Sequence, residues 1–226
     1  MHDRLPGKLS SKNCTKLCKF SIFVIMKLIF ATANRGKLRE AGEILGERFE
    51  LLTPHDLGID EDIPETGETL KENSIQKAMY LYERLGCDCF ADDTGLEVDA
   101  LGGAPGVHSA RYAGEGHDFD ANIRKLLREL EGVPYERRTA RFKNVVTLLI
   151  GGQMYFFEGC LEGHIAPERL GTQGFGYDPV FIPDEFPGHT VAELGEEVKN
   201  AISHRGKSLR AMAAWLKENL PAEEEA

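Results

Sequence analysis

FADDTGLEVDALGGAPGVHSARY, at residues 90–112, is the stretch of the sequence that says most about the fold. Asp92 and Asp93 follow a short apolar run and precede Thr94-Gly95, a pattern that predicts a buried strand ending at the aspartates. Ligands of α/β proteins bind at such strand ends. Neighbouring strand residues point to opposite faces, so we expect one carboxylate to face a pocket and the other to hold loop backbone. A divalent cation would suit the first carboxylate, and an Asx turn that closes the strand is the alternative.

Composition limits the classes of protein to consider. A chain of 226 residues with 42% hydrophobic residues can bury one good core, or two small lobes that share a sheet. The net charge of −10 argues against an extended nucleic-acid-binding surface, while a single nucleotide in a local basic pocket stays compatible with it. The five cysteines are an odd number without paired metal-ligand spacing, which indicates free thiols in a reducing cytoplasm.

The N-terminal region resembles a secretory signal, because lysines precede the apolar run at residues 20–26 and a small-residue motif follows it. We reject this interpretation, since Lys27 leaves the run too short to span a bilayer and cleavage after Ala33 would remove an excellent first strand. We therefore expect a cytoplasmic protein without a membrane segment. Met26 could itself be a start codon, in which case residues 1–25 form an ill-ordered extension outside the fold.

Strand and helix alternate after this region. Residues 27–31 predict a buried strand, residues 32–37 a loop, and the next apolar residues have helical spacing. Backbone N–H groups and the helix dipole attract anions at such a junction, and Asn34, Arg35 and Lys37 add donors suited to phosphate. The glycine spacing of a Walker loop is absent. An ordinary helix start with a solvated lysine is the alternative.

A capping box follows. Thr69 and Glu72 predict the start of a helix whose later apolar residues keep helical spacing. Glu65 lies in the loop before this cap and could meet Asp93 if the following strand lies beside it, although a solvent-facing glutamate is the simpler interpretation. Lys77 lies outside the apolar face of this helix, so a charge on the protein surface is the alternative to a role in the site.

The second half of the chain changes character. Residues 138–150 and 153–158 flank a Gly-Gly turn and predict a β-hairpin, and residues 160–165 predict a further strand. Such a hairpin would make the sheet mixed.

A glycine-rich loop at residues 171–179 bears aromatic rings. An exposed ring such as Phe175 suits a stacked base, worth about 1–3 kcal/mol, and a turn packed on the core is the alternative. A second capping box places Lys199 near a helix end. His204 and Arg205 begin the last helix and could contact the edge of a base, although a helix-capping loop is the commoner explanation.

Six motifs occur along the chain in a fixed order. They are TANRGK at 32–37, ETG at 65–67, ADDTGL at 91–96, LGGAPGVHSARY at 101–112, GFGYDP at 174–179 and SHRG at 203–206. Together they resemble the inosine triphosphate pyrophosphatase family, the XTP/dITP diphosphatases. The resemblance extends from Met26 to about Leu220, which implies a single two-lobed domain at 26–220, with residues 1–25 outside it and an acidic tail at 221–226.

The resemblance implies an α/β fold with an elongated mixed β-sheet flanked by helices, two lobes, a central cleft and a homodimer. It implies hydrolysis of ITP, dITP or XTP to the monophosphate and pyrophosphate with Mg²⁺. Asp93 is the implied catalytic carboxylate, and Glu65 and Asp93 are the implied metal ligands. The implied substrate-binding residues are Thr32, Ala33, Asn34, Arg35, Gly36, Lys37, Lys77, Thr94, Phe175, Gly176, Tyr177, Asp178, Lys199, His204 and Arg205, with Arg111 as a further candidate at the cleft.

Three alternatives remain at this point. A nucleotide-binding sensor would keep the pocket without turnover. A related pyrophosphatase that acts on other modified nucleotides would keep the metal site and change the base pocket. A periplasmic binding protein would require the signal peptide to be genuine.

Overall fold

The computed structural model describes residues 25–220, so the expectations for the N-terminal extension up to residue 24 and for the acidic tail lie outside the described residues. The strands are β1 (Met26–Phe30), β2 (Phe49–Leu52), β3 (Cys89–Val98), β4 (Pro105–Gly106), β5 (Thr139–Ile150), β6 (Gln153–Ile165) and β7 (Phe181–Pro183), and the helices are α1 (Arg35–Leu45), α2 (Leu70–Leu85), α3 (Phe119–Glu129), α4 (Glu196–Ile202) and α5 (His204–Asn219). In this part of the chain no helix combines the length and the apolar character needed to cross a membrane.

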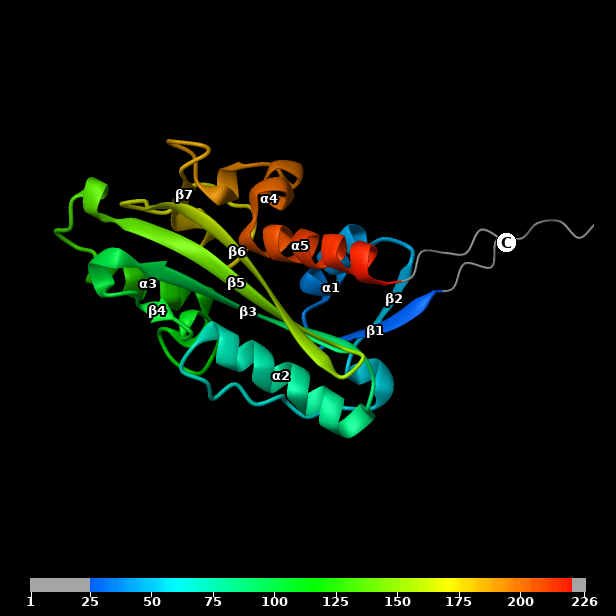
Figure 1. Ribbon diagram of the computed structural model, residues 1–226. Coiled ribbons are helices and arrows are strands. Elements are labelled where there is room, and N and C mark those ends of the chain that lie inside the picture. The colour runs from blue at the N-terminus through cyan, green and yellow to red at the C-terminus, as the bar shows by residue number, and fades with distance from the viewer. Residues whose placement is uncertain (1–24, 221–226) are drawn as a thin grey trace, which may run out of the picture.

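The strands form one mixed sheet, which confirms the expected fold class (Figure 1). The strand order is β2-β1-β3-β5-β6-β7, and β4 pairs with β3. The β1 strand is parallel to both β2 and β3. The pairs β3–β5, β5–β6 and β6–β7 are antiparallel. The β5–β6 hairpin turns at Gly151 and Gly152, both with positive φ, because a two-residue turn needs this conformation to match the twist of the strands.

Helices cover the two faces of the sheet unequally (Figure 1). Helix α2 packs on one face against β3 and β5, while α1 and α5 pack on the other. The stacked rings of Phe30 and Phe90, with centroids 4.2 Å apart, lie in the core beneath α1 and α5. A third cluster at the far end joins α3 to β5, β6 and β7 through residues such as Ile123, Phe142 and Phe181. One cluster thus lies at one end of the sheet, and the other two lie on opposite faces at its other end.

Two strand boundaries differ from the sequence-based expectation. The β3 strand continues to Val98, so Asp92 and Asp93 lie within a strand and not at its end. Gly95 is not a turn residue; its missing side chain lets the backbone of Gly106 in β4 approach, because a Cβ at this position would lie 2.6 Å from the Gly106 carbonyl oxygen. A glycine inside a strand commonly marks such an approach.

The second difference, in β6, also comes from a glycine that lies inside a strand and not at its end. The predicted separate strand at residues 160–165 is the end of β6, which is continuous from Gln153 to Ile165. Gly159 does not interrupt β6. It leaves room for the first turn of α5, since a Cβ here would collide with the carbonyl oxygen of His204 and approach the amide of Ser208.

We expect Gly159→Ala to destabilise the protein by about 1–3 kcal/mol or more, because the added methyl group forces α5 away from β6. Thermal unfolding followed by circular dichroism would measure this as a melting temperature lower by several degrees. Gly42→Ala is the matched control, because no atom lies within 4 Å of a Cβ at this position in α1. The control should gain about 0.5–1 kcal/mol from helix propensity, and equal melting temperatures for the two variants would contradict the close packing.

Candidate active site

The candidate site lies where one edge of β3 changes its partner strand. On this edge β1 pairs with β3 as far as Phe90, and β4 pairs with β3 from Leu96 onward. Among the described residues no strand pairs with this side of β3 between Asp92 and Gly95. A cleft of about 630 Å³ opens at this gap, between α1, the 171–178 loop and the junction of α4 and α5.

Asp93 points to the α2 side of the sheet and lies in a group of polar side chains. Lys77 Nζ is 2.6 Å from Glu65 Oε1 and 3.1 Å from Asp93 Oδ1, and Asn73 Nδ2 donates to Asp93 Oδ2 at 3.1 Å. The alternative of a surface charge at Lys77 is wrong, because this side chain is buried beneath the two carboxylates. The structure thus brings Glu65 and Asp93 together on Lys77, the arrangement that the sequence left open beside the simpler interpretation of a solvent-facing glutamate.

The protonation of this group follows from its burial. Burial raises the pKa of Asp93, and Glu65 adds to this effect, although Lys77 opposes it. Burial alone would lower the pKa of Lys77, but Asp93, Asp92 and Glu65 outweigh it and raise the pKa. Lys77 is therefore charged, and Asp93 binds a proton more readily than an ordinary aspartate.

The carboxylates also fit a divalent cation. Glu65 and Asp93 already share one cationic group, the Lys77 ammonium. Within residues 25–220 no group of three or more acidic, histidine or cysteine side chains converges as a complete metal site. Mg²⁺ binds through one or two carboxylates together with substrate phosphate oxygens, so a pair of carboxylates facing a cleft suits this ion.

The start of α1 forms the neighbouring wall of the cleft. The helix begins at Arg35, within the predicted loop, because the Asn34 side chain caps it by accepting hydrogen bonds from the backbone N–H groups of Gly36 and Lys37. Asn34, Gly36 and Lys37 line the cleft. The neighbouring candidates Thr32, Ala33 and Arg35 do not line it, and neither does Lys77, which lies behind Asp93.

Asp92 points to the opposite face from Asp93 and is 1% exposed. Its Oδ1 accepts from Lys37 Nζ at 2.8 Å and its Oδ2 from Arg205 Nε at 3.1 Å. The expectation that this carboxylate holds loop backbone is therefore wrong: it pairs with two cations from different helices. Although burial alone would raise the pKa of Asp92, Lys37 and Arg205 hold it well below the usual range. Burial lowers the pKa of Lys37, and the negative charge of Asp92 opposes this effect. Because the pKa of Asp92 is so low, Asp92 is ionised and forms a charged pair with Lys37.

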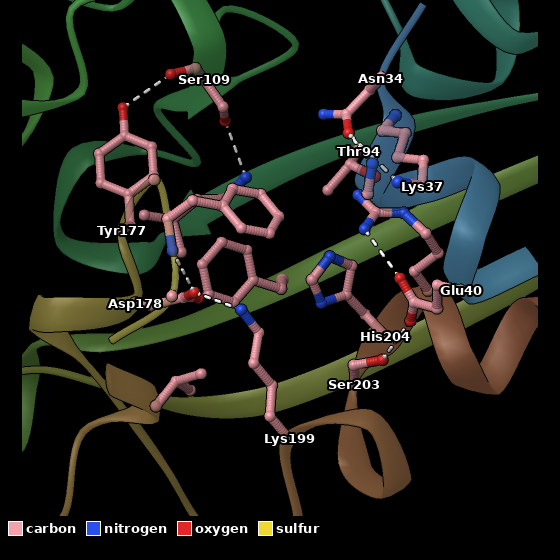
Figure 2. Close-up of a pocket in the computed structure, with 18 of the residues that line it drawn as sticks. Asn34, Lys37, Glu40, Thr94, Ser109, Tyr177, Asp178, Lys199, Ser203 and His204 are labelled. Atoms are coloured by element: carbon pink, nitrogen blue, oxygen red, sulfur yellow. Dashed lines mark hydrogen bonds and ion pairs between the residues drawn. The ribbon is translucent and has the colours of Figure 1, made fainter. Parts of the chain in front are cut away.

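Helix α1 also contacts the turn between α4 and α5. Glu40 accepts hydrogen bonds from Arg205 Nη1 and from Ser203 Oγ, both at 3.2 Å. Figure 2 shows Glu40 beside Ser203 at this side of the cleft. Glu40 was not among the site residues predicted from the sequence. Its position three residues after Lys37, on the same helix face, was the available signal.

The glycine-rich loop forms the other end of the cleft. Asp178 accepts from Lys199 Nζ at 2.6 Å and from the Phe175 backbone N–H at 2.9 Å (Figure 2). The Phe175 ring is 52% exposed, and Lys199 Nζ lies 4.5 Å from its centroid. A side chain at Gly174 would collide with the Asp178 carboxylate. The loop therefore exposes an aromatic ring, with Lys199 over it, on a backbone fixed by Asp178.

Tyr177 differs from Phe175. Its ring is buried and its hydroxyl donates to the backbone carbonyl of Ser109 at 2.9 Å, so it joins this loop to the segment after β4. Gly176 and Thr94 both line the cleft, with Thr94 bonded to Asn144. Arg111 lies elsewhere, in a separate surface hollow with Lys125.

Within residues 25–220, His204 is the buried side chain whose polar atoms lack a hydrogen-bond partner. Its ring lines the cleft and stacks on Phe142, with centroids 4.9 Å apart. Both ring nitrogens are buried without a hydrogen-bond partner. Burial, followed by the charge of Arg205, keeps the pKa of His204 well below its usual value, so the ring is neutral. Leaving such groups unpaired costs about 1–3 kcal/mol, and a ligand in the cleft could recover this loss.

Comparisons with known proteins agree with this geometry. The sequence model of the Ham1 family matches residues 28–215. A dITP/XTP pyrophosphatase of Porphyromonas gingivalis is 53% identical over 192 residues, which cover 84% of this chain and 97% of the relative. The structure of the Staphylococcus aureus Ham1 protein aligns with a TM-score of 0.79 at 36% identity, covering 85% of this chain and 98% of that one.

A third comparison is the crystal structure of a nucleoside-triphosphatase, or dITP/XTP pyrophosphatase, from Mycobacterium abscessus. It aligns with a TM-score of 0.71 at 42% identity and covers 84% of this chain and 99% of that one. The family match covers most of the chain and includes every segment that lines the cleft. This chain therefore belongs to the Ham1 family.

Proposed function

We propose that this protein hydrolyses the non-canonical purine nucleoside triphosphates ITP, dITP and XTP to the monophosphate and pyrophosphate. One observation carries the proposal: a single cleft is lined by a carboxylate of raised pKa, by an exposed aromatic ring and by a buried histidine whose nitrogens lack partners. This arrangement suits a ligand with phosphates at one end and a base at the other. The relatives from P. gingivalis and M. abscessus are named dITP/XTP pyrophosphatases, which supports the same substrates.

Asp93 is the proposed general base. A water oxygen attacks the α-phosphorus, the bond from that phosphorus to the bridging oxygen of the β-phosphate breaks, and the water proton passes to an Asp93 carboxylate oxygen. The raised pKa of Asp93 favours this transfer near neutral pH. Lys77, held by both carboxylates, orients Asp93, and Lys37 neutralises phosphate charge at the start of α1.

Glu65 and Asp93 would hold the Mg²⁺ ion. When bound, Mg²⁺ neutralises charge on the phosphate oxygens and the leaving pyrophosphate. Chelation with EDTA should abolish pyrophosphate release, and addition of Mg²⁺ should restore it.

The other end of the cleft would select the base. Hypoxanthine and xanthine have an acceptor oxygen at position 6, where adenine has an amino donor. A fixed guanidinium such as that of Arg205 therefore favours the first two, and a mismatched donor pair costs about 1–3 kcal/mol per buried group. Phe175 supplies a stacking surface for any base. Guanine shares the 6-oxygen, so its rejection depends on the surroundings of its 2-amino group.

We also propose that the protein is a cytoplasmic homodimer, on the basis of the family resemblance. Size-exclusion chromatography with light scattering should give twice the mass of the chain, and the mass of a single chain would contradict the dimer.

The first prediction for this function concerns Asp93. We expect Asp93→Asn to lower kcat for pyrophosphate release from ITP by about a hundredfold or more, because it removes the general base without changing volume. Circular dichroism should show an intact fold. Asp60→Asn, at an exposed carboxylate outside the cleft, is the control and should keep full activity. Near wild-type turnover in Asp93→Asn would contradict the assignment of the base.

The second prediction concerns pH. The reaction needs Asp93 without its proton, so activity should fall as the pH is lowered, with a midpoint above the ordinary aspartate pKa of about 3.9. Lys77 lowers the pKa of Asp93, so Lys77→Met should move this midpoint to a still higher pH while reducing the rate. A kcat/KM profile for ITP, measured on both proteins, tests the shift. An unchanged midpoint would show that another group titrates.

The third prediction separates stacking from base selection. We expect Phe175→Ala to weaken kcat/KM for ITP, XTP and ATP by similar factors, because every base can stack. Arg205→Ala should lower kcat/KM for ITP more than for ATP. Melting curves are needed beside the kinetics, because Arg205 also pairs with Asp92 and Glu40. Equal losses for both substrates in Arg205→Ala would assign base selection to another residue.

A further inference from the structure

We propose that Asp92 is a positioning residue that couples the triphosphate end of the cleft to the base end. This inference rests on the proposed function. Asp92 does not line the cleft, so it acts through the two cations that it holds. Those cations are Lys37, from the first turn of α1, and Arg205, from the first turn of α5.

The contacts make this coupling direct. The two oxygens of one carboxylate accept from the two cations, Oδ1 from Lys37 at 2.8 Å and Oδ2 from Arg205 at 3.1 Å. Asp92 is 1% exposed and the Arg205 side chain 8% exposed, so water cannot easily replace either partner. A carboxylate is planar and rigid, and this fixes the position of one cation relative to the other.

Neighbouring groups prevent the carboxylate from turning freely. The Asn144 amide, oriented to satisfy all its neighbours, donates to Asp92 Oδ2 at 3.0 Å and accepts from Ser208 Oγ at 2.6 Å. Glu40 then holds Arg205 and Ser203 from α1. Lys37 is the more accessible cation, with 19% of its side chain exposed. It can therefore respond to a bound phosphate, while Arg205 stays enclosed.

A consequence for selectivity follows. ITP and ATP have the same triphosphate, so a lysine that only contacts phosphate contributes equally to both. If Asp92 joins Lys37 to Arg205, the position of the guanidinium depends on Lys37. Among the described residues, Lys37 and Arg205 are the charged hydrogen-bond partners of Asp92. Loss of Lys37 would free Oδ1 while Arg205 and Asn144 stay on Oδ2, so the carboxylate would turn about Oδ2 and move the guanidinium. Coupling of this kind is reciprocal, so the base would also affect how well the triphosphate is held.

The experiment measures kcat/KM for ITP and for ATP, by pyrophosphate release, in wild type, Lys37→Ala and Asp92→Asn. We expect the ITP to ATP ratio to fall about fivefold or more in both variants. Thr147→Val is the matched control, because it removes a buried hydrogen bond to Ser74 on the opposite face. This control lowers the melting temperature and should leave the ratio unchanged within about twofold, the spread expected for an uncoupled site.

The outcomes are distinct. Equal losses for ITP and ATP in Lys37→Ala would overturn the inference and make Lys37 a phosphate contact alone. Asp92→Asn leaves Lys37 and the buried Arg205 without their shared carboxylate and could fail to fold, in which case Lys37→Ala decides. A ratio that falls equally in Thr147→Val would also overturn the inference, because general loosening would explain it. Absence of pyrophosphate release in wild type would instead contradict the proposed function, and it is seen before any variant is made.

Discussion

The structure depends on how one buried strand accommodates two adjacent carboxylates. Side chains alternate along β3, so Asp92 and Asp93 must lie on opposite faces of the sheet, and both positions are covered by helices. A buried charge is tolerated only when it is paired. Lys77 from α2 meets Asp93, while Lys37 and Arg205 meet Asp92. Helices α1, α2 and α5 are thus each fixed to β3 by a cation.

The pairing on the two faces has different consequences. On the α2 face, Asp93 shares Lys77 with Glu65, and burial leaves it with a raised pKa that suits proton transfer. On the other face, two cations share one carboxylate, and Asp92 stays ionised. The first arrangement provides a reactive carboxylate, and the second provides fixed positive charges. Both reach the same cleft because, in the described part of the chain, the edge of β3 opposite β5 has no strand partner between the end of β1 and the start of β4.

Close approaches at three glycines set the outline of the cleft. Gly95 admits β4, Gly159 admits the start of α5, and Gly174 admits the Asp178 carboxylate that fixes the Phe175 loop. In each case a Cβ would meet an atom that cannot easily move. The closeness of α5 to β6 places His204 over Phe142 with its ring nitrogens unpaired, which leaves two polar atoms available to a ligand.

The sequence by itself determined the mixed α/β class, the α2 capping box at Thr69, the Gly151-Gly152 hairpin and the order of the motifs, because these depend on local periodicity, turn geometry and composition. It left open whether Glu65 would meet Asp93 or face solvent. Only the tertiary structure decided that Asp92 pairs with Lys37 and Arg205, that Lys77 is buried and that Glu40 joins the site. Glycines inside β3 and β6 read locally as strand ends, because their role is to admit a distant segment. Contacts between residues 55 and 113 positions apart leave no periodic signal, since they arise only when separate helices pack on one strand.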